Sequence, residues 1–136
     1  MIMNLKYPII LILFLTLQHP GVWGQNHSGN DTIFNQTDEL GRKQGYWKKT
    51  DTHGNLIYRG FFKDGTPLGK FIRYYNNGSV KSRMYYHPDS RIVDVKFYYT
   101  NGKLAAEGRY SNRETDGEWK YYSFYEDFLS YSENYN

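Results

Sequence analysis

GKFIRYYNNGSVKSRMYY, residues 69–86, has the pattern of a β-hairpin, and the rest of the chain repeats it. Both ends of the stretch are rich in aromatic and β-branched residues, which favour strands. Between them lies Asn76-Asn77-Gly78, and Asn and Gly tolerate the positive φ angles that a tight hairpin turn requires. Similar turn sequences occur at 52–54 and 100–102, and polar turns that close each unit at 63–65 and 111–113.

Four rows of sequence align when the chain is written with a period of 24 residues from Gly45. A fixed period in this range is typical of repeat proteins, in which each unit buries its apolar face against its neighbours. We therefore predict an all-β fold, an antiparallel meander of about four 24-residue β-hairpin repeats that forms an elongated, twisted open sheet. The rows are 45–68, 69–92, 93–116 and 117–131; the repeat-structural columns are Trp47, Phe71, Val95 and Trp119, and the turn glycines Gly54, Gly78 and Gly102.

The second strand of each predicted hairpin alternates in polarity, as in Tyr58, Arg59 and Phe62, which predicts one apolar face and one largely wet face. The first strands are less regular. The column that contains Trp47 lies three residues before another column, and positions three apart cannot share one face of a flat strand. We expect a β-bulge or a strong local twist between them. The second column is Thr50, Tyr74, Tyr98 and Tyr122.

Residues 1–24 are predicted to be a cleaved secretory signal. Lys6 supplies a positive start, an apolar run follows at 9–17, and Gly24 precedes the expected cleavage before Gln25. The run is far shorter than the roughly 18 residues that a membrane span needs. The interpretation is therefore export to the periplasm, the cell envelope or the exterior, with an uncleaved anchor as the alternative.

Residues 25–44 are predicted to be a polar linker. Phe34 and Gly41 lie one period before Tyr58 and Gly65, so the end of the linker is expected to be a partial repeat that caps the first hairpin. Asn-x-Ser/Thr triplets fit N-glycosylation, but such short motifs also arise by chance in polar segments, and we favour chance. They begin at Asn26, Asn30, Asn35 and Asn77.

The fourth row departs from the others because Glu126 replaces the turn glycine. Terminal repeats that depart from the consensus usually cap the stack. We expect Phe128, Leu129 and Tyr131 to form a short edge strand, and residues 132–136 to be a tail that frays.

Composition excludes several classes of protein. Residues 25–136 carry 16 Lys and Arg against 14 Asp and Glu, which is too balanced for a nucleic-acid binder. The chain has no cysteine, so it forms no disulfide and has no cysteine for a lipid anchor. Its stability must come from packing and from the sheet.

The sequence contains no pattern typical of an enzyme. It has no Gly-x-Ser-x-Gly, no His-Glu-x-x-His and no phosphate loop. Glu114, Asp116 and Glu118 could contact a hard cation, but such a site needs about six oxygen ligands, and a solvated acidic turn is the favoured interpretation. We therefore predict no catalytic activity, no cofactor and no metal.

The motif Gly-x-Trp-x-x-Tyr-Tyr-x-x-Gly-x-Leu, clearest in residues 69–80, resembles the bacterial variant of the MORN repeat, the membrane occupation and recognition nexus motif. The resemblance covers about residues 35–131 and implies an exported repeat protein of the YwqK antitoxin-like type. It also implies roles in membrane-lipid binding, scaffolding, self-association or immunity-like neutralisation of a partner. The chain departs from the motif at Val93-Asp94, at Thr50-Asp51 and at Glu126.

A binding module is the functional prediction, with protein as the favoured partner because Tyr and Trp are enriched at protein interfaces. The column Tyr74, Tyr98 and Tyr122 is predicted to face a ligand, with an aromatic ladder that only stabilises the sheet as the alternative. The column Lys48, Lys96 and Lys120, interrupted by Ile72, would suit lipid, glycan or another anionic polymer, although lysines that protect sheet edges give the same pattern. Self-association at the edge strands is a third possibility.

Overall fold

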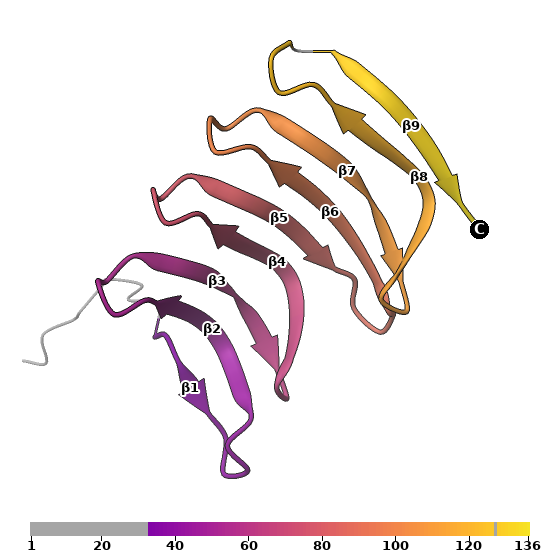
Figure 1. Ribbon diagram of the computed structural model, residues 1–136. Helices are drawn as coiled ribbons and strands as arrows, with labels where there is room; N and C mark the ends of the chain where they lie inside the picture. The colour runs from indigo at the N-terminus through magenta and orange to yellow at the C-terminus, as the bar shows by residue number, and fades with distance from the viewer. Residues whose placement is uncertain (1–32, 127) are drawn as a thin grey trace, which may run out of the picture. The chain divides into compact units, whose positions relative to one another are not determined.

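The structure, a computed structural model, describes residues 33–126 and 128–136. In this part of the chain nine strands form one sheet, and each strand pairs antiparallel with the next strand along the chain (Figure 1). The strands are β1 (Gln36–Thr37), β2 (Lys43–Thr50), β3 (Leu56–Lys63), β4 (Thr66–Tyr74), β5 (Val80–Tyr86), β6 (Ile92–Tyr98), β7 (Leu104–Ser111), β8 (Glu114–Tyr122) and β9 (Leu129–Tyr135). The predicted all-β meander of hairpin repeats is confirmed.

The predicted signal and its cleavage site at Gly24 and Gln25 lie outside the described residues, as do the triplets at Asn26 and Asn30. None of the residues that the structure describes belongs to a helix long and apolar enough to cross a membrane.

A β-bulge separates the two irregular columns in every repeat, as the spacing of three predicted. The hydrogen-bond register shifts between Arg73 and Tyr74, at the end of β4, and at the corresponding place in β2, β6 and β8. The extra residue lies on the partner strand in each case, since Arg73 pairs with Ser82 and Tyr74 with Val80, which leaves Lys81 unpaired. The tyrosine column faces away from the buried column because alternation over three residues reverses the face.

A second kind of register shift occurs in the second and fourth repeats and is missing from the third. The β3–β4 and β7–β8 ladders each shift register near Gly69 and Gly117, both at φ +65°. Val93 occupies the equivalent position in the third repeat, and the β5–β6 ladder runs without a shift. Left-handed backbone costs a residue with a Cβ about 1–2 kcal/mol, so a valine disfavours the turn of backbone that glycine permits.

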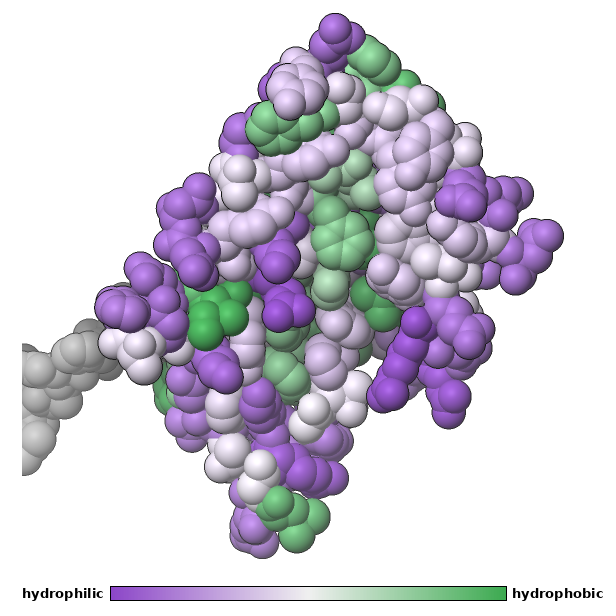
Figure 2. All heavy atoms as spheres, viewed as in Figure 1, coloured by the Kyte–Doolittle hydropathy of each residue, from purple (hydrophilic) through white to green (hydrophobic). Residues whose placement is uncertain are grey.

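The core is a single layer of side chains on one face of the sheet, here called the aromatic face. Its rings contact one another from strand to strand; ring centroids lie 5.8 Å apart for Phe62 and Phe71 and 5.0 Å apart for Tyr110 and Trp119. Apolar and weakly polar residues occupy the middle of the surface seen in Figure 2, with the most hydrophilic residues mostly along its borders. The buried apolar residues of the described chain are Phe62, Phe71, Val95, Ala106 and Trp119.

Several ladders of this face pair a large residue with a small one. The Phe71 ring lies over Gly60, where an added Cβ would be 2.1 Å from Cδ2 of the ring. Trp119 lies over Gly108 in the same way, with a corresponding distance of 2.3 Å. The repeat between them reverses the sizes, because Met84 pairs with Val95. These large–small pairs allow a single layer to pack closely. The ladders between them differ, because Phe71 pairs with Met84, two large residues, and Val95 pairs with Gly108, two small ones.

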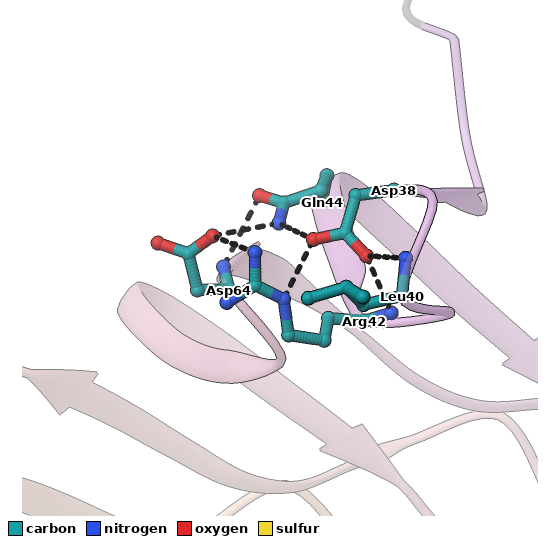
Figure 3. Close-up of polar contacts among 5 residues, drawn as sticks. All are labelled: Asp38, Leu40, Arg42, Gln44 and Asp64. Carbon is teal, nitrogen blue, oxygen red and sulfur yellow. Dashed lines mark hydrogen bonds and ion pairs between the residues drawn. The ribbon is translucent and has the colours of Figure 1, made fainter.

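A polar network ties the partial first repeat to the first full hairpin (Figure 3). The carboxylate of Asp38 accepts hydrogen bonds from the backbone N–H groups of Leu40 (3.0 Å) and Arg42 (2.9 Å). It also accepts from Arg42 Nε (2.7 Å) and Gln44 Nε2 (3.0 Å). Arg42 reaches on to Asp64 Oδ1 at 3.2 Å, so the network joins the β1–β2 turn to the β3–β4 turn.

The C-terminal strand is longer than expected. The prediction that residues 132–136 fray is wrong for 132–135, because β9 pairs with β8 as far as Tyr135, opposite Gly117. The Tyr135 ring contacts Trp119 at 6.5 Å between centroids, and its hydroxyl lies 3.3 Å from that of Tyr121. These ring contacts hold the end of the chain to the sheet.

Ser82→Ala is expected to raise the free energy of unfolding by about 1 kcal/mol. Ser82 is 1% exposed and its hydroxyl has no hydrogen-bond partner among the residues that the structure describes, and such a buried group costs roughly 1–3 kcal/mol. Ala106 occupies the equivalent position one period later. Urea unfolding would measure the change. Ser79→Ala is the control, because the Ser79 hydroxyl donates to Asn77 Oδ1 at 2.7 Å; equal losses in both variants would contradict the expectation.

Candidate functional site

The face opposite the aromatic face, here called the charged face, carries one row of side chains across the sheet. Lys48 on β2 pairs with Arg59 on β3, and the row continues strand by strand to Ser132 on β9. The predicted lysine column therefore lies in this row, on alternate strands. The row is Lys48, Arg59, Ile72, Arg83, Lys96, Glu107, Lys120 and Ser132.

The predicted tyrosine column lies on the same face, because each ring contacts a side chain of the row. Arg59 lies 6.0 Å from the Tyr74 ring centroid and Arg83 lies 5.9 Å from that of Tyr98. In the next repeat the Tyr122 hydroxyl donates to Glu107 Oε1 at 2.7 Å. This hydrogen bond raises the pKa of Tyr122.

Sequence reasoning missed the residues that these tyrosines contact. Arg59, Arg83 and Glu107 are separated by the same period of 24 residues as the tyrosines, which was the available signal. The offset of 15 residues between each of them and its tyrosine arises from the hairpin pairing and the bulge, so strand alternation alone did not reveal the contact.

The charged face contains a groove of about 530 Å³ over β4 to β8. Ile72 and Tyr85 give it apolar surface between the charged groups. The volume is in the range of small-ligand sites, but the groove is open and shallow because it lies on one sheet. Its charged lining residues are Lys70, Arg83, Asp94, Lys96, Glu107, Glu118 and Lys120.

Charges on the β6–β8 half of this face are paired. Lys96 Nζ lies 2.8 Å from Glu107 Oε2, and Lys120 Nζ lies 3.4 Å from Glu118 Oε2. The hydrogen bond from Lys96 lowers the pKa of Glu107, and the same contact raises the pKa of Lys96. Glu107 therefore remains ionised at neutral pH, and the pairing of opposite charges keeps the net charge of this half small.

Asp94 belongs to the same paired half. Its Oδ2 lies 2.6 Å from His87 Nε2 and its Oδ1 accepts from Arg109 Nε at 3.0 Å. The hydrogen bond to His87, followed by that from Arg109, lowers the pKa of Asp94.

The β2–β5 half has cations without carboxylates. Within residues 33–126 and 128–136, none of its cations forms an ion pair, and four lie against rings instead: Lys48 on Phe34, Arg59 on Tyr74, Lys81 on Tyr75 and Arg83 on Tyr98. Cation–π contacts leave the positive charge available to a ligand. The cations are Lys48, Arg59, Lys63, Lys70, Lys81 and Arg83.

The remaining predicted positions lie elsewhere. The column that begins with Trp47 lies on the aromatic face, and the turn glycines have φ angles of 82–86°. Glu114, Asp116 and Glu118 do not converge, since the described residues include no group of three or more His, Asp or Glu side chains that could hold a metal ion.

Two segments of the chain match the family model of the MORN repeat variant, at residues 67–87 and 93–112. They correspond to the β4–β5 hairpin and to the β6–β7 hairpin. These two segments are thus similar to the MORN repeat variant, as the sequence motif indicated. No curated protein and no solved structure matches it significantly.

Proposed function

We propose that this chain, two segments of which are similar to the MORN repeat variant, is an exported, non-catalytic binding module that holds another protein on its charged face. The observation that supports the proposal most directly is the row of cations with tyrosines stacked against it beside an open groove. Arg and Tyr are the residue types that dominate the energetics of protein interfaces.

The distribution of charge favours a protein over a uniform polyanion. The groove is lined by Asp94, Glu107 and Glu118 as well as by cations. These carboxylates repel a ligand that is negative along its whole length, whereas a protein surface can place acidic residues only over the β2–β5 half. Apolar surface at Ile72 and Tyr85 suits side chains of such a partner.

An anionic polymer or lipid head group is the second candidate. It is favoured by one observation, the cations of the β2–β5 half, none of which forms an ion pair within the part of the chain that the structure describes. Salt separates the candidates, because binding that neutralises many phosphates or sulfates weakens steeply with ionic strength and apolar protein contacts do not.

Export is proposed from residues 1–24 alone. A positive residue, Lys6, precedes the apolar run 9–17 and a small residue, Gly24, precedes the expected cleavage site. A secreted or envelope partner follows from this proposal.

Charge reversal on the charged face is expected to weaken partner binding about tenfold or more. The experiment introduces a photo-crosslinking amino acid at Tyr98 in the full chain, expressed in its native cells, and identifies what it captures. An Arg59→Glu, Arg83→Glu variant should lose the captured protein. The same samples show whether this protein begins at Gln25 and is found outside the cytoplasm, as the proposed export requires.

The matched control reverses two charges on the other face. Lys49 and Arg73 lie opposite Tyr58 in the ladders, so Lys49→Glu, Arg73→Glu places the same charge change on the aromatic face. Equal loss in both double variants, or capture that neither changes, would contradict the proposed surface. Salt-sensitive capture of lipid or polysaccharide in place of protein would favour the second candidate.

A further inference from the structure

The two edges of the sheet are covered differently. At the β2 edge, Asn35 N donates to the Tyr46 carbonyl at 2.9 Å, and Asn35 Oδ1 accepts from Lys48 N at 2.9 Å. At the other edge β9 pairs only with β8, and no other described strand lies beyond it. An uncovered edge presents unpaired backbone N–H and C=O groups, which can pair with another strand.

The edge at β9 has exposed apolar side chains in and beside the strand, and few of the features that prevent edge pairing. Its strand, Leu129–Tyr135, contains no Lys and no Pro, and Glu133 is its one charged residue. Its single bulge lies at the start of the strand, between Leu129 and Tyr131, which pair with Tyr122 and Tyr121. The large exposed side chains around it are Tyr125 (86% exposed), Tyr131 (56%), Phe128 (52%), Leu129 (46%) and Phe124 (41%).

We propose that a second copy of this chain pairs with β9 through its own β9, antiparallel and centred on Ser132. Two identical strands related by a two-fold axis present the same surface to each other. Residues directly opposite must point to the same face, so the axis must pass beside a residue rather than between two. The regular pairs are then Tyr131 with Glu133 and Ser132 with its own copy, and the bulge at Ser130 keeps Leu129 and Ser130 out of regular pairing with Tyr135 and Asn134.

Other centres give poorer pairs. An axis at Glu133 places two carboxylates directly opposite each other, which is destabilising. An axis at Tyr131 sets Leu129 against Glu133 and leaves residues 134 and 135 without partners. The centre at Ser132 opposes no like charges and sets Tyr131 opposite Glu133 on both sides of the axis.

The chemistry of the proposed pairs already occurs within the fold. Tyr135 donates to Glu133 Oε2 at 2.7 Å, and Tyr122 donates to Glu107 at the same distance. A carboxylate has several acceptor sites, so Glu133 can also accept from Tyr131 of the second copy. The charged-face groove over β4 to β8 is not part of this edge, so the proposal is independent of the proposed function.

Cysteine crosslinking tests the register, because the chain has no cysteine of its own. Directly opposite residues of an antiparallel pair have Cα atoms about 4.5–5.5 Å apart, which suits a disulfide. Ser132→Cys is therefore expected to give a covalent dimer rapidly under mild oxidation. Asn134→Cys is the matched control, since in the proposed register the two copies of residue 134 lie four positions apart, roughly 13 Å along the strands.

Sedimentation tests the association itself. The unmodified full chain is expected to sediment with twice its monomer mass. Ser132→Lys sets two lysines opposite each other and is expected to sediment as a monomer, and circular dichroism checks that this variant is folded. The proposal is overturned by a native chain that stays monomeric, by a dimer that persists in folded Ser132→Lys, or by equal crosslinking rates for the two cysteine variants.

Discussion

Gly108→Ala is expected to lower the free energy of unfolding by about 3 kcal/mol, at the upper end of the usual cost of overpacking. The added Cβ would lie 2.3 Å from Cδ2 and 2.5 Å from Cε2 of Trp119, within the ring system rather than at a flexible end. Either the indole or the β7 backbone must move. In an open strand position the same substitution would be mildly stabilising, because alanine is less free than glycine in the unfolded chain. Chemical denaturation monitored by tryptophan fluorescence measures the loss.

The repeat at Met84 and Val95 supplies the matched control, because it packs a large residue where Gly108 lies and a small one where Trp119 lies. Gly108→Met alone should be at least as destabilising as Gly108→Ala. Combined with Trp119→Val it should cost less than the two single changes together, with a coupling of about 2 kcal/mol. Additive losses would show that the two positions do not share one volume, and would contradict the packing argument.

Trp119→Ala is expected to cost about 3–5 kcal/mol. The side chain is 3% exposed and its ring contacts those of Phe97, Tyr110 and Tyr121 at centroid distances of 6.4, 5.0 and 6.3 Å. Its Nε1 also donates to the Arg109 carbonyl at 3.0 Å, which anchors the indole over β7. Removal leaves a cavity between β7 and β9, and the unfolding midpoint in urea measures the effect.

Trp47→Ala provides the comparison, since Trp47 is the same residue type in the same column. It is only half-buried and lies near the covered β2 edge, where its Nε1 donates to the Gln36 carbonyl at 2.9 Å. A smaller loss of about 1–2 kcal/mol is expected, in proportion to the smaller apolar area removed from water. Equal losses at the two positions would argue that column membership, rather than burial, sets the stability.

Much of the fold could be predicted from local pattern. The turn Asn77-Gly78 and its copies identify the hairpins because few residues accept positive φ, and strand alternation separates the two faces. A bulge was expected beside Tyr74 and occurs there, but the two columns lie on opposite faces, as alternation over a spacing of three gives. These signals act within a few residues along the chain.

The candidate site could be predicted only in part. Tyr98 and Lys96 were singled out from their columns, but the contact of Tyr98 with Arg83 joins residues 15 apart on neighbouring strands. The register after each bulge decides which residue lies opposite a given residue on the neighbouring strand. A shift of one residue would move every side chain of the strand to the other face.

The sequence by itself therefore determined the repeat, the hairpin turns, the apolar alternation and the bulge, because each depends on local backbone preference. Tertiary structure decided the rest: the exchange of sizes between Met84–Val95 and Gly108–Trp119, the division of the charged face into a paired and an unpaired half, and the open edge at β9. These depend on distances between strands, and ring packing and charge pairing are set by those distances rather than by residue type.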